Sequence, residues 1–234
     1  QGVVDPQMTG IAGFGSLQAY LPGRAIHECI DFHGKSPAAT RDDMWSDLIE
    51  GETRDGFGFI LKGRVNDVGY QSITVPGSLK AYAEAQIAWG RLSWADVMQP
   101  AIAEAKTGAI VRPHVYNWWT TNDGSGRVLS AERLGLTASG RQIYFNKDGS
   151  LKRVGERLNN PEMADTLRHL AARGAEDFYT GELAGHIASD MMANEGLLSA
   201  QDLSDYSTCH GSHFVEIIGG YKLLPISHRV AALC

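Results

Sequence analysis

The segment RAIHECIDFHGKSPAATRDDMW, residues 24–45, decides how the chain begins to fold. Apolar Ile26, Ile30 and Phe32 occupy alternate positions in its first half, so they fall on one face of an extended chain. A period of two in a run with β-branched and aromatic residues is typical of a strand with one buried face. The sequence therefore predicts a β-strand that ends near Phe32.

A basic cluster follows this predicted strand. His33 and Lys35 flank Gly34 directly after the strand, and Arg41 lies a few residues further on. Backbone amides around a glycine, together with basic side chains, can hold an anion. The residues leave two interpretations open: an anion pocket at the strand end, or an ordinary solvated turn.

Helical patterns dominate the middle of the chain. Thr40 stands three residues before Asp43, which is an N-cap pattern, so we expect a short helix through Leu48. Longer apolar periodicities with start and stop signals predict helices within 76–90, 92–108, 159–174 and 181–196. Pro100 interrupts the second of these, and we expect a kink or a break there because proline removes a backbone donor.

Strand signals lie on both sides of these helices. Residues 9–23 are a glycine-rich turn followed by an apolar strand. Residues 141–155 read as a short strand, an Asp148-Gly149 turn and a polar strand or loop, and residues 214–225 as two strands about Gly219-Gly220. Strands at both ends of a helical middle predict an α+β fold in one domain, residues 1–234.

Composition excludes several classes of partner. The net charge is −6, and the 21 Lys and Arg residues are scattered, so a nucleic-acid partner or an anionic membrane is not expected. No apolar run reaches the roughly 18 residues that span a bilayer, and no signal-peptide pattern is present. The 3 cysteines cannot all pair with one another, and none is in a CxxC motif, so we expect free cysteines in the core rather than a disulfide framework.

Two groups of residues resemble catalytic or metal-binding sites, but ordinary structural roles explain both. His27, Asp31 and His33 would share one face of a strand, as metal ligands can, and His210 with His213 forms an HxxH pair. Neither spacing is specific to a metal, so no metal ligand is assigned. Similarly, Ser212 lies beside two histidines, but the G-x-S-x-G elbow of a Ser-His-Asp hydrolase is missing from the sequence.

Four colinear segments resemble one known family. They are GVVDPQMTGIAGFG (2–15), IDFHGKSPAATRDDMW (30–45), the run VPGSLKAYAEAQIAWGRLSWADVMQPAIAEAKTGAIV (75–111), and the run from NNPEMADTLRHLAARG to AQDLSDY (159–206). Each is similar to a segment of the gamma-glutamyltransferase family, in the same order. The resemblance covers nearly the whole chain.

The resemblance implies a fold and a chemistry. Members of this family are N-terminal-nucleophile hydrolases with a four-layer αββα core, made as a precursor that cuts itself into two subunits. A threonine at the start of the small subunit attacks an amide carbonyl, with its own α-amine as base and without a metal or organic cofactor. That threonine lies downstream of this chain, so no catalytic residue is assigned here, and residues 1–234 correspond to an internal part of the large subunit. The implied partner is the small subunit from the same precursor.

One substrate contact of the family falls within the chain. The family has Asp-Phe-Arg-Glu where this sequence has Asp31-Phe32-His33-Gly34, and the family's arginine grips the α-carboxylate of a γ-glutamyl group. We therefore predict that His33 and Lys35 bind substrate. The substitution leaves open whether the acyl group is still γ-glutamyl, or whether the complete protein is an acylase with another specificity.

Three further expectations follow from the resemblance. A degenerate scaffold without activity is a rival hypothesis, which a downstream threonine cleavage site would exclude. The chain alone should not turn over a γ-glutamyl anilide, because it lacks the nucleophile. Many family members are exported, but the compartment of this protein is not predicted.

Overall fold

The computed structural model describes residues 2–6, 9–212, 216–218 and 221–223. Its strands are β1 Gly15–Leu21, β2 Ile26–Phe32, β3 Ile49–Glu52, β4 Phe59–Leu61, β5 Ala109–Ile110, β6 Arg157–Leu158, β7 Cys209–Ser212, β8 Glu216–Ile218 and β9 Tyr221–Leu223. Its α-helices are α1 Ser78–Trp89, α2 Trp94–Thr107, α3 Pro113–Thr120, α4 Ser130–Leu134, α5 Ala138–Tyr144, α6 Pro161–Arg173, α7 Asp177–Thr180, α8 Glu182–Ala193 and α9 Ala200–Ser204. Short 3₁₀ helices cover Pro22–Arg24, Ser46–Leu48, Lys62–Arg64 and Tyr70–Ser72. The α+β class expected from the sequence is confirmed.

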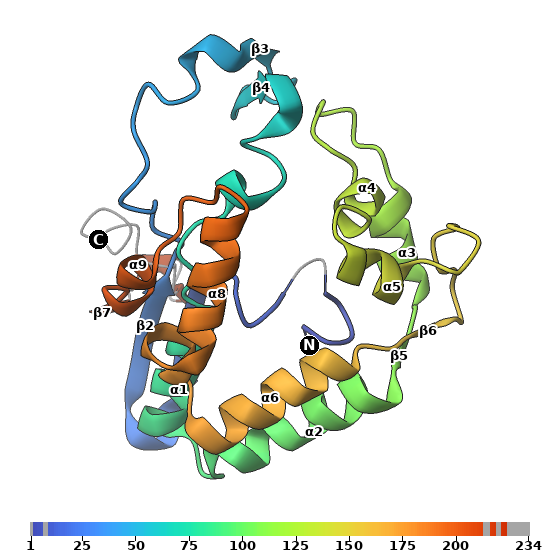
Figure 1. The fold of residues 1–234 in the computed structure, drawn as a ribbon. Helices are drawn as coiled ribbons and strands as arrows, with labels where there is room; N and C mark the ends of the chain where they lie inside the picture. The colour runs from blue at the N-terminus through green and yellow to red at the C-terminus, as the bar shows by residue number, and fades with distance from the viewer. Residues whose placement is uncertain (1, 7–8, 213–215, 219–220, 224–234) are drawn as a thin grey trace.

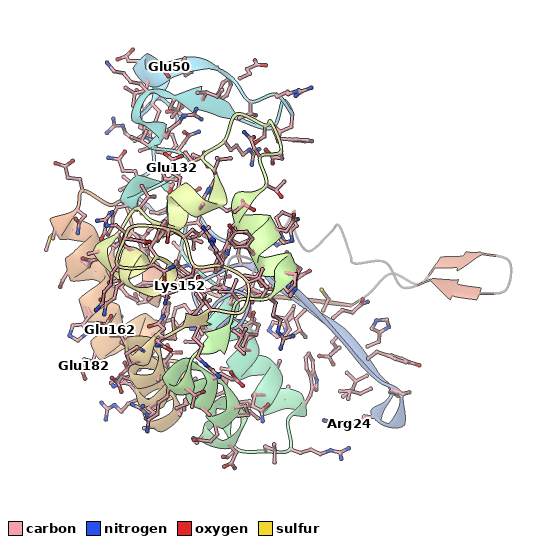
Figure 2. The ribbon with its side chains drawn as sticks, turned by 90° about the vertical axis from the view of Figure 1, so that its right-hand side faces the viewer. Arg24, Glu50, Glu132, Lys152, Glu162 and Glu182 are labelled. Atoms are coloured by element: carbon pink, nitrogen blue, oxygen red, sulfur yellow. The ribbon has the colours of Figure 1, made fainter. Side chains whose placement is uncertain are left out.

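The elements form an open ring around the N-terminal segment (Figure 1). The strands β1 and β2 stand on one side with α1, α8 and α9, and the paired helices α2 and α6 lead across to α3, α4 and α5 on the other side. The β3–β4 hairpin lies at the top of this view, and Figure 2 places Glu50 there. Arg24 lies at the tip of the β1–β2 hairpin, far from Glu50 (Figure 2).

The predicted strand at residues 26–32 is the centre of the sheet that positions the site. β2 pairs antiparallel with β1 on one side and with β7 on the other. Phe32 is opposite Gly15 of β1, and Asp31 is opposite Cys209 of β7. The C-terminal end of β2 is therefore enclosed between chain segments that lie far apart in the sequence.

Helix α1 covers one face of this sheet. Ile30 and Phe32 of β2 are buried against Ala81 of α1, with Leu17 and Trp89 packed beside them. Burying an Ile or Phe side chain contributes about 1.5–3 kcal/mol, so these contacts hold the end of β2 firmly against the helix. Because side chains alternate along a strand, Asp31 projects from the opposite face.

The main hydrophobic core joins α2, α6, α7, α8 and α9. Met98 and Ile102 of α2 are buried in the same cluster as Leu167 and Leu170 of α6. Indole Nε1–H of Trp94 donates to the Leu170 carbonyl oxygen at 2.9 Å, which fixes the register of the two helices. The predicted helices within 76–90, 92–108, 159–174 and 181–196 are all present as α1, α2, α6 and α8.

Helix α2 continues through Pro100, so the expected break is wrong. Proline removes one backbone hydrogen bond from the helix. Here Met98 and Ile102 are buried on either side of it, and Ser93 caps the N-terminus by accepting from the Asp96 amide. Packing and capping together outweigh the lost hydrogen bond.

The helix expected from Thr40 to Leu48 is also wrong. Residues 42–45 form turns, and within this segment only Ser46–Leu48 is helical, as a 3₁₀ turn. Residues 40–43 are all exposed, so the segment has no buried apolar face to stabilise a helix. The Thr40 amide instead donates to the Pro37 carbonyl oxygen at 3.0 Å.

The strand expected at the start of residues 141–155 is largely a helix. α5 runs from Ala138 to Tyr144, and Thr137 caps it by accepting from the Gly140 amide at 3.0 Å. Its last residue stacks edge-on against buried Trp119, with ring centroids 5.7 Å apart. The expected turn at Asp148-Gly149 is present: its flanking residues meet in a single antiparallel bridge between Phe145 and Leu151.

The remaining expectations concern the C-terminal strands, the cysteines and membrane spans. β8 and β9 pair antiparallel as expected, whereas Gly219-Gly220 lies outside the described residues. Cys29 is free and buried in β2, but Cys209 is disulfide-bonded, which corrects the expectation for that residue. None of the helices in the described part of the chain is long and apolar enough to cross a membrane.

Candidate substrate-binding site

Asp31 and His33 form a hydrogen-bonded pair at the end of β2. Oδ1 of Asp31 lies 2.5 Å from Nδ1 of His33 and also accepts the His33 backbone N–H at 3.0 Å. The Asp31 side chain is only 7% exposed, whereas the His33 side chain is 61% exposed. Phe14 lies beside the imidazole, with ring centroids 6.2 Å apart. The buried carboxylate therefore anchors an imidazole that reaches toward solvent.

Gly34 allows the chain to turn tightly after this pair. A Cβ atom at position 34 would lie 2.3 Å from Oγ1 and 2.9 Å from Cβ of Thr74. On the next residue, the Lys35 backbone forms a bridge with Val75, whose N–H donates to the Lys35 carbonyl oxygen at 2.8 Å. The acidic residue of the family pattern would not fit at Gly34 in this packing.

The Lys35 ammonium is held by the segment that follows α9. Nζ donates to Oγ of Ser207 at 3.2 Å and lies 5.3 Å from the centroid of the Tyr206 ring. The ring face offers a cation–π contact, and the hydroxyl offers an acceptor. These contacts hold the ammonium group in the lining of the cavity that His33 also lines.

Tyr206 closes the inner side of the site. It is buried, donates its hydroxyl to the His33 carbonyl oxygen at 3.0 Å, and stacks on Tyr179. Its hydroxyl can approach because position 77 is glycine: a Cβ there would lie 1.9 Å from the Tyr206 oxygen. Burial, with the nearby charges of Asp31 and Glu84, raises the pKa of Tyr206 to about 12, so it remains a donor.

Helix α9 ties this inner wall to the turn after Lys35. The helix begins with a capping box in which Ser199 and Asp202 exchange hydrogen bonds. The second carboxylate oxygen of Asp202 accepts the Ala38 amide at 2.8 Å. Burial raises the pKa of Asp202, but the hydrogen bonds from Ser199 and Ala38 outweigh it and leave the pKa below its ordinary value. Asp202 therefore remains ionised and joins the two walls.

These groups enclose a cavity of about 460 Å³, lined by Asp31, His33, Lys35, Ser36, Tyr206 and Ser207 among others. The structure thus brings His33 and Lys35, the residues predicted to bind substrate, into one cavity. Arg41 is not part of its lining and pairs with Asp43 instead. The sequence analysis did not predict Tyr206 or Ser207 as site residues. Tyr206 is the last residue of a segment that resembles the family, and Ser207 follows it directly.

A larger cavity of about 750 Å³ lies between the N-terminal segment and α6. Glycine backbone and apolar side chains dominate its lining, which includes Gly10, Gly13, Phe14 and Met163. It contains no Asp, Glu, Lys, Arg or His of the described residues, so it offers no charged group to bind or transfer a proton. The smaller cavity is the better candidate for polar recognition.

The alternative metal constellation is not assembled. His27 lies at the other end of β2, where Nε2 contacts the Gln18 side chain at 2.7 Å and the ring packs on Tyr20. Among the described residues, no group of three or more His, Cys, Asp or Glu side chains is placed to hold a metal ion. His210 contacts Glu84 at 3.0 Å, and the prediction for His213 lies outside the described residues.

Comparisons with solved structures define the class of protein. The chain superposes on gamma-glutamyltranspeptidase from Helicobacter pylori with a TM-score of 0.81 at 22% identity, covering 99% of this chain and 61% of that one. It also matches gamma-glutamyltranspeptidase from Pseudomonas nitroreducens, with a TM-score of 0.78 at 26% identity, covering 99% and 62%. The fold is therefore that of the N-terminal-nucleophile hydrolases of this type.

Sequence comparisons identify the family. A family model described as Gamma-glutamyltranspeptidase matches residues 1–231. Acylase ACY 1 proenzyme from Pseudomonas sp. (strain V22) is 35% identical over 206 residues, 87% of this chain and 34% of that protein. Glutathione hydrolase 5 proenzyme from Mus musculus is 32% identical over 205 residues, 88% of this chain and 32% of that protein.

The chain belongs to the gamma-glutamyltranspeptidase family, and the resemblance found in the sequence is confirmed. It spans about a third of the length of the curated relatives it matches, 34% in the case of the acylase.

Proposed function

We propose that the complete protein is a gamma-glutamyltransferase-like amide hydrolase or acyltransferase, and that residues 1–234 are a single-domain part of its large subunit. The family match along residues 1–231 supports this, as do relatives named acylases and glutathione hydrolases. Several of those relatives are named proenzymes, which supports a precursor cut into two subunits. The small subunit from the same precursor is then the partner of this chain.

The proposed chemistry uses a threonine downstream of this chain. Its hydroxyl attacks the amide carbonyl, its α-amine takes the hydroxyl proton, and that proton is passed to the departing amine. Water or an acceptor amine then breaks the acyl ester and restores the threonine. No step needs a metal or an organic cofactor, and this chain contributes binding rather than the nucleophile.

The observation that carries the proposal is the cavity at the end of β2. By the sequence resemblance, His33 stands where the family has its carboxylate-gripping arginine, and the ammonium group of Lys35 lines the same cavity. An anionic acyl donor fits such a cavity, because both side chains can offer charge-assisted hydrogen bonds. We assign substrate binding to these two residues.

A second candidate function is an acylase with a non-glutamyl acyl group. The replacement of a bidentate arginine by His33, with Gly34 beside it, favours a different acyl donor, and a relative at 35% identity is named an acylase. An inactive scaffold is the third alternative. The inactive scaffold differs from the two enzymes in what happens to the complete protein after synthesis, and the two enzymes differ in the acyl donor that they accept.

The intact mass of the complete protein over time is the first test. Two chains, with threonine at the new N-terminus, would support a self-processing enzyme, and a single mass that never splits would support an inactive scaffold. Turnover of γ-glutamyl anilide against glutaryl anilide would then separate the first two functions. The isolated 234-residue chain should turn over neither, and measurable activity by that chain would contradict the assignment to a large subunit.

A further inference from the structure

The hydrogen bonds of Asp31 fix which nitrogen of His33 carries a proton. Oδ1 of Asp31 receives two contacts from His33, the backbone N–H at 3.0 Å and Nδ1 at 2.5 Å. An ionised carboxylate only accepts hydrogen bonds, so Nδ1 must be the protonated nitrogen. Nε2 is then a bare acceptor when the imidazole is neutral, and a donor only when the imidazole is a cation.

The other ring nitrogen is available to a ligand. Nε2 has no hydrogen-bond partner among the residues that the structure describes, and the His33 side chain is 61% exposed at the mouth of the cavity. A carboxylate oxygen would meet the lone pair of neutral Nε2, and the two would repel. The same oxygen would accept a charge-assisted hydrogen bond from the imidazolium.

The remaining charged or titratable groups around His33 do not change this outcome. Lys35 adds one positive charge, and Asp31 adds one negative charge that His33 already contacts. The raised pKa of Tyr206 keeps its side chain neutral, and its hydroxyl donates a hydrogen bond to the His33 carbonyl oxygen. Cys209 is disulfide-bonded and does not titrate. The charge of the lining thus rises from zero to one positive unit when His33 takes a proton.

We propose that His33 recognises the carboxylate of a dicarboxylic acyl donor only in its protonated form, and that Asp31 is the positioning residue that imposes this condition. The proposal rests on the proposed function and adds a proton requirement to its substrate recognition. An arginine at this position would bind the same carboxylate at every physiological pH, because it does not lose its charge. In this protein, acidification strengthens recognition of the donor.

The kinetic test uses the complete, self-processed protein with two matched donors between pH 5.5 and 8.5. Glutaryl anilide carries a carboxylate and no amine that would titrate, and the corresponding glutaramide anilide is its neutral counterpart. We expect KM for the charged donor to rise with pH by about 10- to 100-fold in total, the range for losing one charge-assisted hydrogen bond. KM for the neutral donor should stay flat, and kcat should show no difference in slope between the donors.

Two variants and one control separate positioning from structure. Asp31→Asn keeps an acceptor for Nδ1 but removes the negative charge beside the imidazolium, so the rise in KM should begin at lower pH than in the unaltered protein. His33→Gln should remove the rise altogether. His210→Gln is the matched control, since His210 also contacts a carboxylate, Glu84, but does not line the cavity. Equal pH slopes for both donors, or a rise that survives in His33→Gln, would overturn the proposal.

Direct binding makes the result independent of turnover. Titration of the complete protein with glutarate, followed by calorimetry, should show binding about 10-fold or more tighter at pH 5.5 than at pH 8.5. Glutarate affinity that does not change with pH would overturn the protonation requirement. If neither donor is turned over while glutarate binding keeps this pH dependence, the proposed function fails and the recognition mechanism stands.

Discussion

Asp31 and Asp177 are both buried carboxylates that contact a histidine, but different groups surround them. Asp177 accepts the backbone amides of Glu182 and Leu183 at the start of α8. Its carboxylate also contacts Nε2 of His169 at 2.8 Å and Nε of Arg173 at 3.9 Å. The His169 side chain is 28% exposed, less than half the exposure of His33. Asp177 thus joins α6 to α8, whereas Asp31 joins a strand to a cavity.

The electrostatics of Asp177 fit this structural role. Burial raises the pKa of Asp177, but the Leu183 amide, His169 and the Glu182 amide outweigh it, and the pKa lies below its ordinary value. Asp31, in contrast, gives one oxygen to two groups of a single residue, His33, which reaches solvent. We therefore expect a buried Asp–His pair to act in binding where the histidine reaches solvent, and to act in structure where backbone amides of another helix share the carboxylate.

The largest effect should come from breaking the structural pair. Asp177→Ala leaves two amides at the start of α8 and the ring of His169 without their acceptor, which should lower the free energy of unfolding by about 2–4 kcal/mol. Urea unfolding of the complete protein measures this. Asp165→Ala is the control, since Asp165 is 71% exposed and pairs with Arg168 on the same helix, and it should change stability by less than about 1 kcal/mol. Equal losses in the two variants would contradict the structural role of Asp177.

The Asp31–His33 pair, which we propose binds substrate, should respond in binding rather than in stability. His33→Arg supplies a permanent charge and a bidentate donor, so KM for glutaryl anilide at pH 8 should fall by about 10- to 100-fold, with little change in kcat. Steady-state kinetics of the self-processed protein measures this, with His210→Arg as the control that should leave KM unchanged. A loss of stability without a change in KM would place Asp31–His33 in the same class as Asp177–His169.

The sequence predicts the elements that local signals define, and it misses those that depend on contacts between distant segments. α6 was predicted because its signals are local: Asn160 caps it, Pro161 opens it and Gly174 follows it. At residues 141–144 the sequence predicts a strand, but these residues lie in α5. The contact of Tyr144 with Trp119 at the end of this helix joins two distant segments, so no local sequence pattern reveals it. The opposite error occurs at Thr40, where an N-cap pattern predicts a helix that is not formed. The next three residues, 41–43, are all exposed, so burial does not stabilise a helix there.

The same distinction between local signals and distant contacts applies to the residues of the candidate site. His33 and Lys35 were predicted together because they are neighbours in sequence after one strand. Tyr206 and Ser207 reach them only because β7 pairs with β2 and α9 is tied to residue 38, which are contacts between distant segments. The alternation of β2 placed Asp31 on the correct face, but its role as an anchor for the imidazole required the contact distances.

Tyr206 tests whether the inner wall stabilises the functional pair. Tyr206→Phe removes the donor to the His33 carbonyl oxygen and should lower the free energy of unfolding by about 1 kcal/mol at pH 7. Burial, with the charges of Asp31 and Glu84, raises the folded-state pKa of Tyr206 from 10.0 to about 12, so the stability gained by keeping the phenol neutral is complete below pH 10 and is lost as pH rises through about 12. Unfolding measured from pH 8 to 11.5 should therefore show a shallower decline in the variant. Parallel curves would mean that Tyr206 does not titrate in a buried setting.

The smallest effect should come from a more exposed histidine–carboxylate contact, between His210 and Glu84. Their side chains are 56% and 30% exposed, and Oε2 of Glu84 also accepts the Thr208 hydroxyl at 2.6 Å, so the carboxylate keeps a partner when the ring is removed. Exposed pairs contribute about 0–1 kcal/mol, and His210→Gln should change the free energy of unfolding by less than about 0.5 kcal/mol. Urea unfolding at low and high salt checks this. If His210→Gln lowered the free energy of unfolding as much as Asp177→Ala does, exposure would not distinguish the two contacts. The solvent-exposed His210–Glu84 contact would then stabilise the fold as strongly as the buried His169–Asp177 contact.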